Sequence, residues 1–489
     1  MQNRFDWSRP QRQPIAGLGI VFLNTFWEIL KRMWPFLLIV LFRDNDEEKD
    51  GPDRFLIITF IFLGFTIISA ILNFIFFKFY IEEGKLIIKK GWFKKETRAI
   101  PLARIQTVNI EQGPLHQLLN IVKLSIDTAG SDKAEAKIDA LHLSMAEALR
   151  TQLVVEKKES LTEEEQPAHT APLIRLTTKD LLKLSISANH VEAFFIFLSF
   201  GIGLYENLKN IDDTFFSGMQ DALPRNSIYP LLFLVMAILI ITILVSTARI
   251  FFGFYDFSIF KKEKNLHIRS GLTNIKQRVI SYPKIQFVSW EANWIRKLMD
   301  LWMLEYHVAG GDEIRNKLKV QIPVTQNRFI PLLSEAYHPL PLINEEVTVR
   351  MHSSFIWRRL LIMGILPAIA IIPLVWIWWE YKALFYLFIP AIIAIVAWRS
   401  QIKFRLWALD DVLHIKKGIF GEERILMKWN KLQAVEVSQS IYQRKNGLAN
   451  LILFTAGGNI RIYFISLQAA QAISNYVLYK TESSEENWM

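Results

Sequence analysis

The sequence contains no cysteine among its 489 residues. Disulfide bonds, thiolate metal sites and cysteine nucleophiles are therefore excluded. A cleaved signal peptide is not predicted, because Arg4, Asp6, Arg9 and Arg12 precede the first apolar run and no small-residue cleavage site follows. The net charge of +10 does not indicate a nucleic-acid-binding arm, since 47 acidic residues are mixed with 57 basic ones. We expect no nucleic-acid partner.

The short motifs of common enzymes are also missing. There is no phosphate-binding P-loop, no Gly-x-Ser-x-Gly elbow and no His-Glu-x-x-His pair, and Gly17-Leu-Gly19 lacks the third glycine of a dinucleotide fingerprint. His267 and His414 share one position of an internal repeat, but the remaining copy has Ile87 there. We interpret this as a partly exposed strand position, and not as a metal ligand or a base. The sequence therefore predicts no enzyme, no catalytic residue, no metal and no cofactor.

Apolar and aromatic side chains are abundant. They make up 51% of the chain, with 35 Phe and 15 Trp, which is typical of a membrane protein. Phe55–Phe77 carries no charge and is long enough to cross a hydrocarbon core of about 30 Å. Before it, a helical stripe from Ile15 leads to Trp34-Pro35, so the first span is either one kinked helix or an interfacial helix plus a short span. Four further spans are predicted at about 190–205, 228–252, 356–379 and 383–398.

The basic residues that flank these spans predict the orientation of the chain in the membrane. One side carries Lys78, Arg249, Arg358, Arg359, Arg399, Lys403 and Arg405, and the other Arg43, Lys49, Arg54, Lys209, Arg225 and Lys382. By the positive-inside rule this bias favours cytoplasmic termini and cytoplasmic repeats. The expected localisation is the cell membrane, with about six spans.

One stretch of the chain occurs three times. The copies, Lys85–Phe93, Asn265–Thr273 and Val412–Phe420, alternate apolar and polar residues up to a glycine. The three glycines are Gly91, Gly271 and Gly418; a glutamine follows each after fifteen residues (Gln106, Gln286, Gln433) and an Ala-Gly pair after thirty-eight (Ala129, Ala309, Ala456). Equal spacings in three copies indicate an internal repeat of one structural unit.

Each copy reads as short strands followed by one capped helix. The predicted helix starts are Ser144, Thr325 and Ser466. Copy three departs from the pattern, because Asn120 and Asp300 lie fourteen residues after their glutamines, whereas Asn450 lies seventeen after Gln433. We therefore expect a reshaped loop in copy three.

These signals divide the chain into alternating membrane and strand-rich segments. The predicted segments are spans one and two with an N-terminal interfacial helix (1–77), strand-rich domain one (78–155), a linker (156–177), spans three and four (178–253), domain two (254–335), a linker (336–350), spans five and six (351–403), domain three (404–480) and a tail (481–489).

The triplicated signature resembles that of the bacterial PH-like domain membrane proteins of the YdbS/YdbT type. The residues that carry the resemblance are Leu86–Gly91 with Arg104-Ile105-Gln106, Leu266–Gly271 with Lys284-Ile285-Gln286, and Leu413–Gly418 with Lys431-Leu432-Gln433. Three units of a helix pair plus a domain are similar to the longer, three-domain member of that family. The resemblance implies a multi-pass α-helical membrane protein with three small cytoplasmic PH-like domains, each a split barrel capped by a C-terminal helix. It also implies a smaller one-domain partner, a role in envelope defence against membrane-active peptides, and no catalytic residue.

Basic and glutamine side chains near the signature strands are the candidate contact residues for a lipid headgroup or a partner. They are Lys89, Lys90, Arg104, Gln106, Arg269, Lys284, Gln286, Lys416, Lys417, Lys431 and Gln433. Several cations near an anionic leaflet could hold the domains against it, at roughly 1 kcal/mol each. The other interpretation is structural: the glutamine ties a loop to the sheet, and the cations are an outward face or a positive-inside signal. A PH-like fold does not by itself imply phosphoinositide binding.

Two functions follow from these observations. The first is a non-enzymatic scaffold that binds membrane lipids, a smaller relative or further copies of itself. The second is a transporter or export channel for peptides or lipids, with Pro367, Pro373 and Pro390 as sites for broken helices. Neutral substitutions of Glu28, Lys31 and Arg32, the charges nearest the first span, would separate the two functions.

Overall fold

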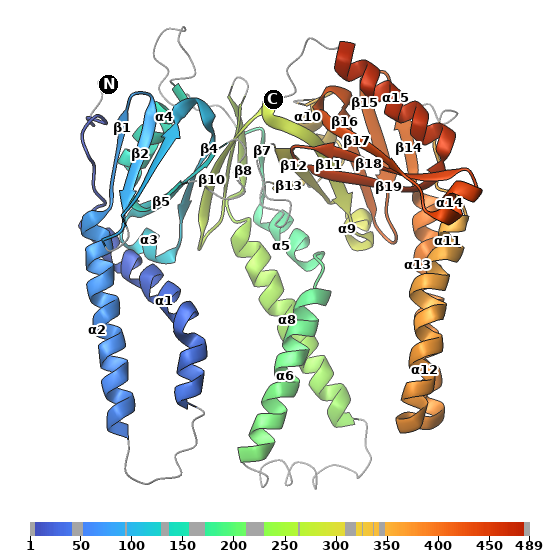
Figure 1. Ribbon diagram of the computed structural model, residues 1–489, viewed down its shortest axis with the longest axis horizontal. Helices are drawn as coiled ribbons and strands as arrows, with labels where there is room; N and C mark the ends of the chain where they lie inside the picture. The colour runs from blue at the N-terminus through green and yellow to red at the C-terminus, as the bar shows by residue number, and fades with distance from the viewer. Residues whose placement is uncertain are drawn as a thin grey trace. The chain divides into compact units, whose positions relative to one another are not determined.

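Three successive sets of strands, each followed by a helix, form the β-structure of the chain (Figure 1). The computed structural model describes residues 5–41, 52–92, 95–128, 136–155, 172–211, 229–262, 265–308, 319–324, 326–335, 337–341 and 348–483. The chain divides into two compact units. Unit 1 comprises Met1–Arg175 with Phe257–Ile280, and unit 2 comprises Leu176–Asp256 with Ser281–Met489.

Each set of strands corresponds to one copy of the repeat, and we call the copies repeats one, two and three. Repeat one contains β1 (Lys78–Glu82), β2 (Lys85–Lys90), β3 (Glu96–Pro101), β4 (Ile105–Gln112), β5 (Ile121–Thr128) and β6 (Ala136–His142), then α4 (Leu143–Val155). Repeat two contains β8 (Ser258–Lys262), β9 (Asn265–Ser270), β10 (Ile275–Ser281), β11 (Ile285–Ala292), β12 (Trp302–Val308) and β13 (Lys319–Val324), then α10 (Phe329–Glu335). Repeat three contains β14 (Arg405–Ala408), β15 (Val412–Lys417), β16 (Glu422–Lys428), β17 (Leu432–Ser438), β18 (Leu448–Thr455) and β19 (Gly458–Ser466), then α15 (Leu467–Ser483).

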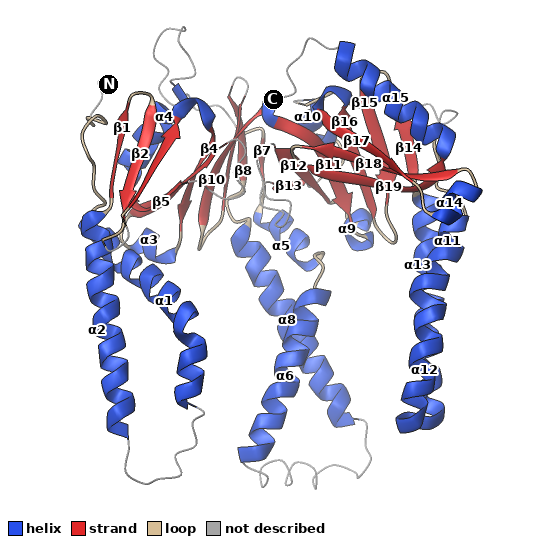
Figure 2. Cartoon of the chain, in the orientation of Figure 1, coloured by secondary structure: helices blue, strands red, loops and turns tan. Residues whose placement is uncertain are grey.

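The sheets do not coincide with the repeats (Figure 2). Unit 1 holds a three-stranded sheet, β1-β2-β3, and a seven-stranded sheet in the order β6-β5-β4-β10-β9-β8-β7, where β7 is Ile174–Arg175. Unit 2 holds a six-stranded sheet in the order β13-β12-β11-β16-β15-β14 and a three-stranded sheet, β17-β18-β19. Repeat two therefore contributes its first three strands to a sheet with repeat one and its last three to a sheet with repeat three.

Alternation of apolar and polar residues explains why the signature segments form strands. In β2, Leu86 and Ile88 are buried whereas Lys85 and Lys89 are exposed, which is the period of two expected for a strand covered on one face. The apolar faces of repeat one enclose a continuous core, which Trp7 of the N-terminal segment also joins. A second core lies in repeat three under α15. The amphipathic strand pattern of the signature therefore places each core.

Turn geometry accounts for the signature glycines. Gly91, Gly271 and Gly418 have φ angles of 88°, 107° and 151°. A Cβ atom would lie 2.1 Å from the Asn274 carbonyl oxygen at Gly271, and 2.6 Å from that of Gly421 at Gly418. The backbone conformation and the lack of space both require glycine at these two turns.

The expected reshaped loop in copy three is wrong. Fourteen residues after its glutamine, each copy has a residue in the left-handed region: Asn120 at φ 51°, Asp300 at 51° and Gly447 at 62°. The equivalent of Asn120 is thus Gly447 and not Asn450. A five-residue helix precedes this corner in every repeat, namely α3 (Pro114–Leu118), α9 (Trp294–Leu298) and α14 (Ile441–Lys445). Gly and Asn are interchangeable there because both tolerate a positive φ.

Of the predicted helix starts, one is confirmed as a cap. The Ser466 hydroxyl accepts a hydrogen bond from the Ala469 N–H at 3.2 Å, next to the start of α15. α4 begins at Leu143, so Ser144 lies in the first turn, two residues after the cap position, and the predicted cap is wrong. Thr325 lies outside the described residues, and α10 begins at Phe329. The Asp300 carboxylate accepts a hydrogen bond from the Asn327 N–H at 3.1 Å and holds the preceding residues in a turn.

The helices outside the repeats fall into three groups, one before each repeat. The first group is α1 (Leu18–Leu41) and α2 (Pro52–Phe76), and the second is α5 (Thr178–Ile186), α6 (Val191–Ile211) and α8 (Tyr229–Gly253). In the third group, α11 (Ser354–Arg359), a π-helical segment (Leu360–Ile365) and α12 (Leu366–Trp379) follow one another directly, and α13 (Phe388–Lys403) comes after them. The first helix continues through Pro35 as one element. In unit 1, α1 and α2 extend away from the strands (Figure 1).

By length and composition, three described helices could cross a membrane: Val235–Gly253, Ser354–Ile377 and Ala383–Lys403. A bent pair, Thr178–Ile186 with Val191–Gly203, meets the same criteria together, with a break of 62°. The apolar segment Ile61–Phe76 of α2 is shorter than these. These helices match the last three predicted spans, and the third predicted span is the second half of the bent pair.

Candidate functional site

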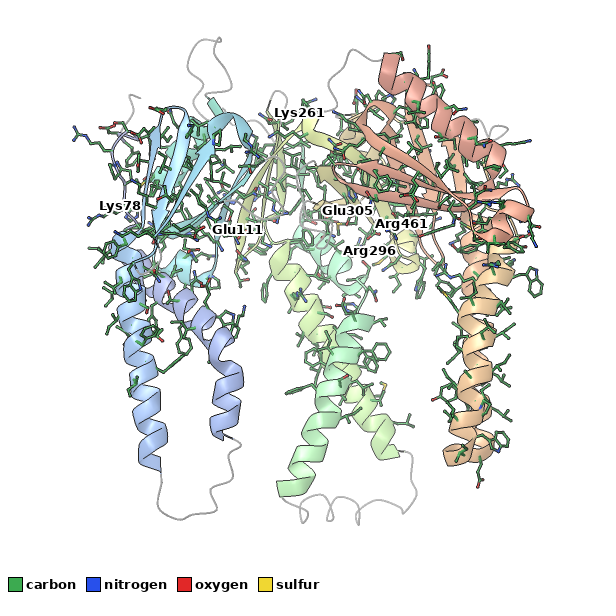
Figure 3. The ribbon with its side chains drawn as sticks, viewed as in Figure 1. Lys78, Glu111, Lys261, Arg296, Glu305 and Arg461 are labelled. Atoms are coloured by element: carbon green, nitrogen blue, oxygen red, sulfur yellow. The ribbon has the colours of Figure 1, made fainter. Side chains whose placement is uncertain are left out.

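The contacts between neighbouring repeats are the most developed polar and strand-edge sites in the structure. In unit 1, β4 of repeat one pairs antiparallel with β10 of repeat two, and we call this contact joint one. Its register is Gln112 opposite Ile275, Glu111 opposite Lys276 and Ile110 opposite Gln277. Glu111, on the repeat one side, is labelled in Figure 3. Opposite charges directly across an antiparallel pair stabilise its register.

In unit 2, β11 of repeat two pairs antiparallel with β16 of repeat three, and we call this contact joint two. Six residue pairs run from Ala292 opposite Glu422 to Phe287 opposite Met427. Equivalent residues are 180 positions apart between repeats one and two and 147 apart between repeats two and three, as the signature glycines 91, 271 and 418 fix. Gln112 and Ile275 therefore correspond to Ala292 and Glu422. The two joints have the same register.

The short helix after the first edge strand also crosses both joints. In joint one, the Gln117 Nε2 of α3 donates to the Leu272 carbonyl at 2.9 Å and to the Thr273 carbonyl at 3.1 Å. In joint two the equivalent residue of α9 is Lys297, whose Nζ lies 2.6 Å from the Glu422 Oε2. The residue at this position of the repeat, Gln117 or Lys297, thus binds the neighbouring repeat in both joints.

Tyr337 extends joint two where its strand ladder ends. The phenol O–H donates to the Gln286 carbonyl of β11 at 2.7 Å, and the oxygen accepts from the Lys428 N–H of β16 at 2.7 Å. The side chain is buried, and burial raises the pKa of the Tyr337 phenol well above its usual range. It therefore stays protonated and can serve both strands at once.

A charge cluster surrounds Glu422 at the other end of joint two. The Arg424 Nε lies 2.6 Å from the carboxylate and the Lys416 Nζ 3.7 Å, in addition to Lys297. Burial alone would raise the pKa of Glu422, but the hydrogen bonds from Lys297 and Arg424 outweigh it and lower the pKa to about 2. The carboxylate is therefore ionised, and it links all three cations.

A second polar cluster lies on the six-stranded sheet. Ser289, Glu305 and His307 are all buried, on β11 and β12. The His307 Nε2 lies 2.9 Å from the Ser289 Oγ and 3.6 Å from a Glu305 oxygen, and the Gln321 Nε2 donates to Glu305 at 2.9 Å. Figure 3 labels Glu305. The serine and the carboxylate both approach the same histidine nitrogen, so this is not the arrangement of a nucleophilic triad, in which they use different nitrogens.

Several of the predicted contact residues have partners inside the protein. The Lys89 Nζ lies 5.3 Å above the Tyr80 ring, Lys90 pairs with Glu96 at 3.3 Å, and Lys417 pairs with Glu423 at 3.0 Å. Lys416 belongs to the Glu422 cluster. The Lys431 Nζ, which is buried, donates to the Pro283 carbonyl of repeat two at 3.0 Å. This last contact holds two repeats together and not a lipid.

The remaining predicted residues are spread over the repeats. Arg104, Arg269 and Gln433 are exposed, and Lys284 is half-buried. Gln286 is fully buried in β11, with its Nε2 3.5 Å from the Lys284 carbonyl oxygen. Gln106 lies in β4, and its side chain falls outside the described residues. Their contact with lipid or a partner stays a prediction.

Three further residues of joint two carry no signal in the sequence pattern. Tyr337, Glu422 and Gly421 lie outside the triplicated spacing, so no repeat signal marks them. Lys297 could have been found, because it has the same place in the repeat as Gln117. Alignment of the two short helices would have placed both at one end of a strand edge.

Comparison with known proteins agrees with the repeat. A family model of the bacterial PH domain matches the chain three times, over residues 29–156, 199–330 and 355–481. The UPF0699 transmembrane protein YdbT of Bacillus subtilis (strain 168) is 25% identical over 463 residues, which cover 90% of this chain and 92% of that protein. The triplicate found in the sequence and the three strand sets of the structure are thus three copies of one known domain.

Proposed function

Because the chain belongs to the bacterial PH domain family and carries the domain three times, we propose that it is a non-enzymatic membrane scaffold. In this role the three PH-like domains act as one continuous array, and the helix pairs between them anchor it in the membrane. The scaffold binds membrane lipids or partner proteins and contributes to envelope defence against membrane-active antimicrobial peptides.

The joints between repeats are the observation that carries this proposal. Joint two combines a six-pair ladder, a buried tyrosine that bridges its end, and a carboxylate that links cations from both repeats. Contacts this extensive suit a rigid platform better than three domains that bind ligands independently. Lys416 and Lys431 take part in contacts inside the protein, which also supports a rigid platform.

The proposed arrangement in the membrane is six spans with the termini and all three PH-like domains in the cytoplasm. The helices Val235–Gly253, Ser354–Ile377 and Ala383–Lys403 support three of these spans. The basic residues at the repeat-side ends of the spans, such as Arg249 and Lys403, support the orientation. The Lys403 Nζ also donates to the Gly421 carbonyl at 2.9 Å, which fixes the end of α13 to repeat three.

The proposed partners are membrane lipids, a smaller one-domain PH-like membrane protein and further copies of the chain. Exposed cations near the membrane, such as Arg269, would contact anionic headgroups. A relative with a single PH-like domain would present the same strand edges as the repeats that meet in the joints.

Cells that lack the gene and express joint variants would test the scaffold function. We expect the joint-breaking substitution Gly421→Val to abolish protection against a membrane-active peptide at equal protein abundance. The matched control is Tyr306→Phe, which removes a buried hydroxyl that donates to the Leu333 carbonyl within repeat two. This variant should leave protection intact. Full protection by a Gly421→Val protein whose joint two is open to proteolysis would overturn the proposal.

The alternative is a transporter or export channel for peptides or lipids, and breaks in the helices favour it. The π-helical segment Leu360–Ile365 interrupts one candidate span, Pro373 lies inside α12, and the bent pair at 187–190 breaks another. Interrupted membrane helices often line substrate sites. Purified protein in vesicles would then carry a labelled peptide across the bilayer, and neutral substitution of Glu28 and Lys31 would reduce flux with the joints intact. Absence of flux with retained protection favours the scaffold.

A further inference from the structure

Each end of the repeat array has an edge strand that is paired on one side within the described part of the chain. In unit 1, β3 pairs with β2 and has no second strand partner among the described residues. In unit 2, the same holds for β17, which pairs with β18. By position in the repeat, β3 corresponds to β10 and β16, and β17 corresponds to β4 and β11. The two strands thus occupy the repeat positions that form joints one and two elsewhere in the chain.

Burial distinguishes these two edges from the strands of joint two. On β16, Ile425 and Leu426 are 3% and 0% exposed, whereas the equivalent residues of β3, Arg98 and Ala99, are exposed. On β11, Phe287 and Ser289 are buried. Their equivalents on β17, Ala434 and Glu436, are exposed. The positions that a joint covers elsewhere in the protein are uncovered here.

We propose that β17 of one molecule pairs with β3 of a second copy of this chain, antiparallel and in the register of joints one and two. The equivalences 327 residues apart give the opposed pairs Lys95 with Gln439, Glu96 with Ser438, Thr97 with Val437, Arg98 with Glu436, Ala99 with Val435, and Ile100 with Ala434. The occupant is a second copy because the chain itself supplies both halves of the contact. The inference rests on the strand edges alone and holds for a scaffold or a transporter.

The side chains at the proposed register are complementary. In this register Arg98, whose Nε also lies 2.6 Å from the Glu96 Oε1 of its own strand, would face Glu436. Opposite charges face each other in joint one as well, at Lys276 and Glu111. Thr97 and Val437, which are opposed next to them, are β-branched and suit a cross-strand pair. Charges on an edge strand also deter non-specific pairing. Joints one and two define one register, and in that register the charges of Arg98 and Glu436 are opposite. This match would favour a second copy of the chain over other strands.

The short helix of repeat three is placed to cross the same contact. Arg444 of α14 is exposed and occupies the position of Gln117 and Lys297, which hold the neighbouring repeat in joints one and two. Across the proposed contact it would reach the backbone carbonyl of Trp92, the equivalent of Leu272. The contact uses different surfaces on the two molecules, so it is head-to-tail and can extend into a ring or an open chain.

The absence of cysteine from the chain permits a direct test. Two differently tagged full-length proteins, one with Arg98→Cys and one with Glu436→Cys, are expressed together and oxidised mildly in isolated membranes. Directly opposed antiparallel residues are about 4.5–5.5 Å apart at Cα, within reach of a disulfide. We expect a disulfide-linked dimer that carries both tags. Thr97→Cys with Glu436→Cys is the matched control and should give little dimer, because successive side chains point to opposite faces of a strand.

Three results would overturn the proposal. The first is that the control pair cross-links as much as the Arg98→Cys and Glu436→Cys pair. The second is that this pair does not cross-link although its thiols still react with a maleimide. The third is that, in a chain that carries both Arg98→Cys and Glu436→Cys, the disulfide forms only within that chain. A charge exchange provides a second measurement. Arg98→Glu or Glu436→Arg alone should reduce the mass of the complex extracted in mild detergent, and the two together in one chain should restore it. Failure of the double variant to restore the mass counts against the proposed register.

Discussion

The Tyr337 hydroxyl of repeat two accepts a hydrogen bond from the Lys428 N–H of repeat three at 2.7 Å. The same hydroxyl donates to Gln286 in the adjacent strand, so one side chain continues the ladder of joint two. We predict that Tyr337→Phe leaves both backbone groups without this partner and costs about 1–3 kcal/mol. Hydrogen exchange should accelerate at Lys428 and along β16.

Tyr306→Phe is the matched control for this prediction, because Tyr306 is also buried but donates to the Leu333 carbonyl of its own repeat. Hydrogen exchange in the Tyr306→Phe variant should accelerate near α10 and not in β16. If both variants altered β16 alike, Tyr337 would have no special part in joint two.

A second prediction concerns the close approach of Gly421 to repeat two. A Cβ atom at this position would lie 2.3 Å from the Ala292 carbonyl oxygen, so Gly421→Val forces β16 away from β11. We expect faster proteolysis of the connection between repeats two and three. Gly253→Ala, where a Cβ meets nothing within 4 Å, is the control and should behave as the native chain does. Unchanged proteolysis of Gly421→Val would contradict the geometry of joint two.

Acid should weaken joint two through Glu422. Its pKa is about 2 in the folded protein, below the ordinary value of 4.5. The folded state therefore gains stability from this group above pH 4.5, and that gain is lost as the pH falls toward 2. Glu422→Gln should be less stable at neutral pH, because Lys297, Arg424 and Lys416 lose their shared counter-charge. It should also lack the acid dependence in this range, which chemical unfolding at several pH values would measure. A native-like loss of stability between pH 4.5 and 2 in the variant would assign the effect to other groups.

His414 predicts a separate pH dependence. It is 2% exposed, so the predicted partly exposed position is wrong for this copy, whereas the equivalent His267 is half-buried. The ring stacks between Trp290 and Trp407, and neither of its nitrogens has a hydrogen-bond partner among the described residues. Burial, aided by the charges of Arg424 and Lys416, lowers the pKa of His414 from 6.5 to about 4. Stability should therefore be full above pH 6.5 and fall as the pH drops toward 4, by up to about 3 kcal/mol.

The variant His414→Phe isolates this effect, since an aromatic ring can keep the stacking while nothing titrates. Its unfolding free energy should be flatter between pH 6.5 and 4 than that of the native chain. An identical slope in both proteins would show that His414 is not the group that responds. Tyr306→Phe, which leaves the histidine in place, should retain the native slope.

The fold of each repeat could be predicted from the sequence because its determinants are local. Strand alternation places Leu86 and Ile88 in the core, and the positive φ angles of Gly271 and Gly418 explain the signature glycines. Even the error at Asn450 came from matching residue type where backbone geometry, carried by Gly447, was what recurred.

The joints could not be predicted in the same way. An edge strand has the same alternating pattern whether its neighbour belongs to its own repeat or to another, so sequence periodicity does not identify the partner. Lys431 shows the consequence: its spacing indicated an outward cation, whereas the side chain is buried against the Pro283 carbonyl. The contact that distinguishes the two interpretations of Lys431 joins residues 148 positions apart.

The most direct test of the joined array is disulfide formation across both joints in the cysteine-free chain. One full-length variant carries Glu111→Cys and Lys276→Cys in joint one, and another carries Glu291→Cys and Glu423→Cys in joint two; each pair is directly opposed. We predict that both variants form a disulfide within a single chain under mild oxidation in membranes. If neither disulfide forms while the thiols remain reactive, or if the links join different chains, the repeats are not connected edge to edge as described.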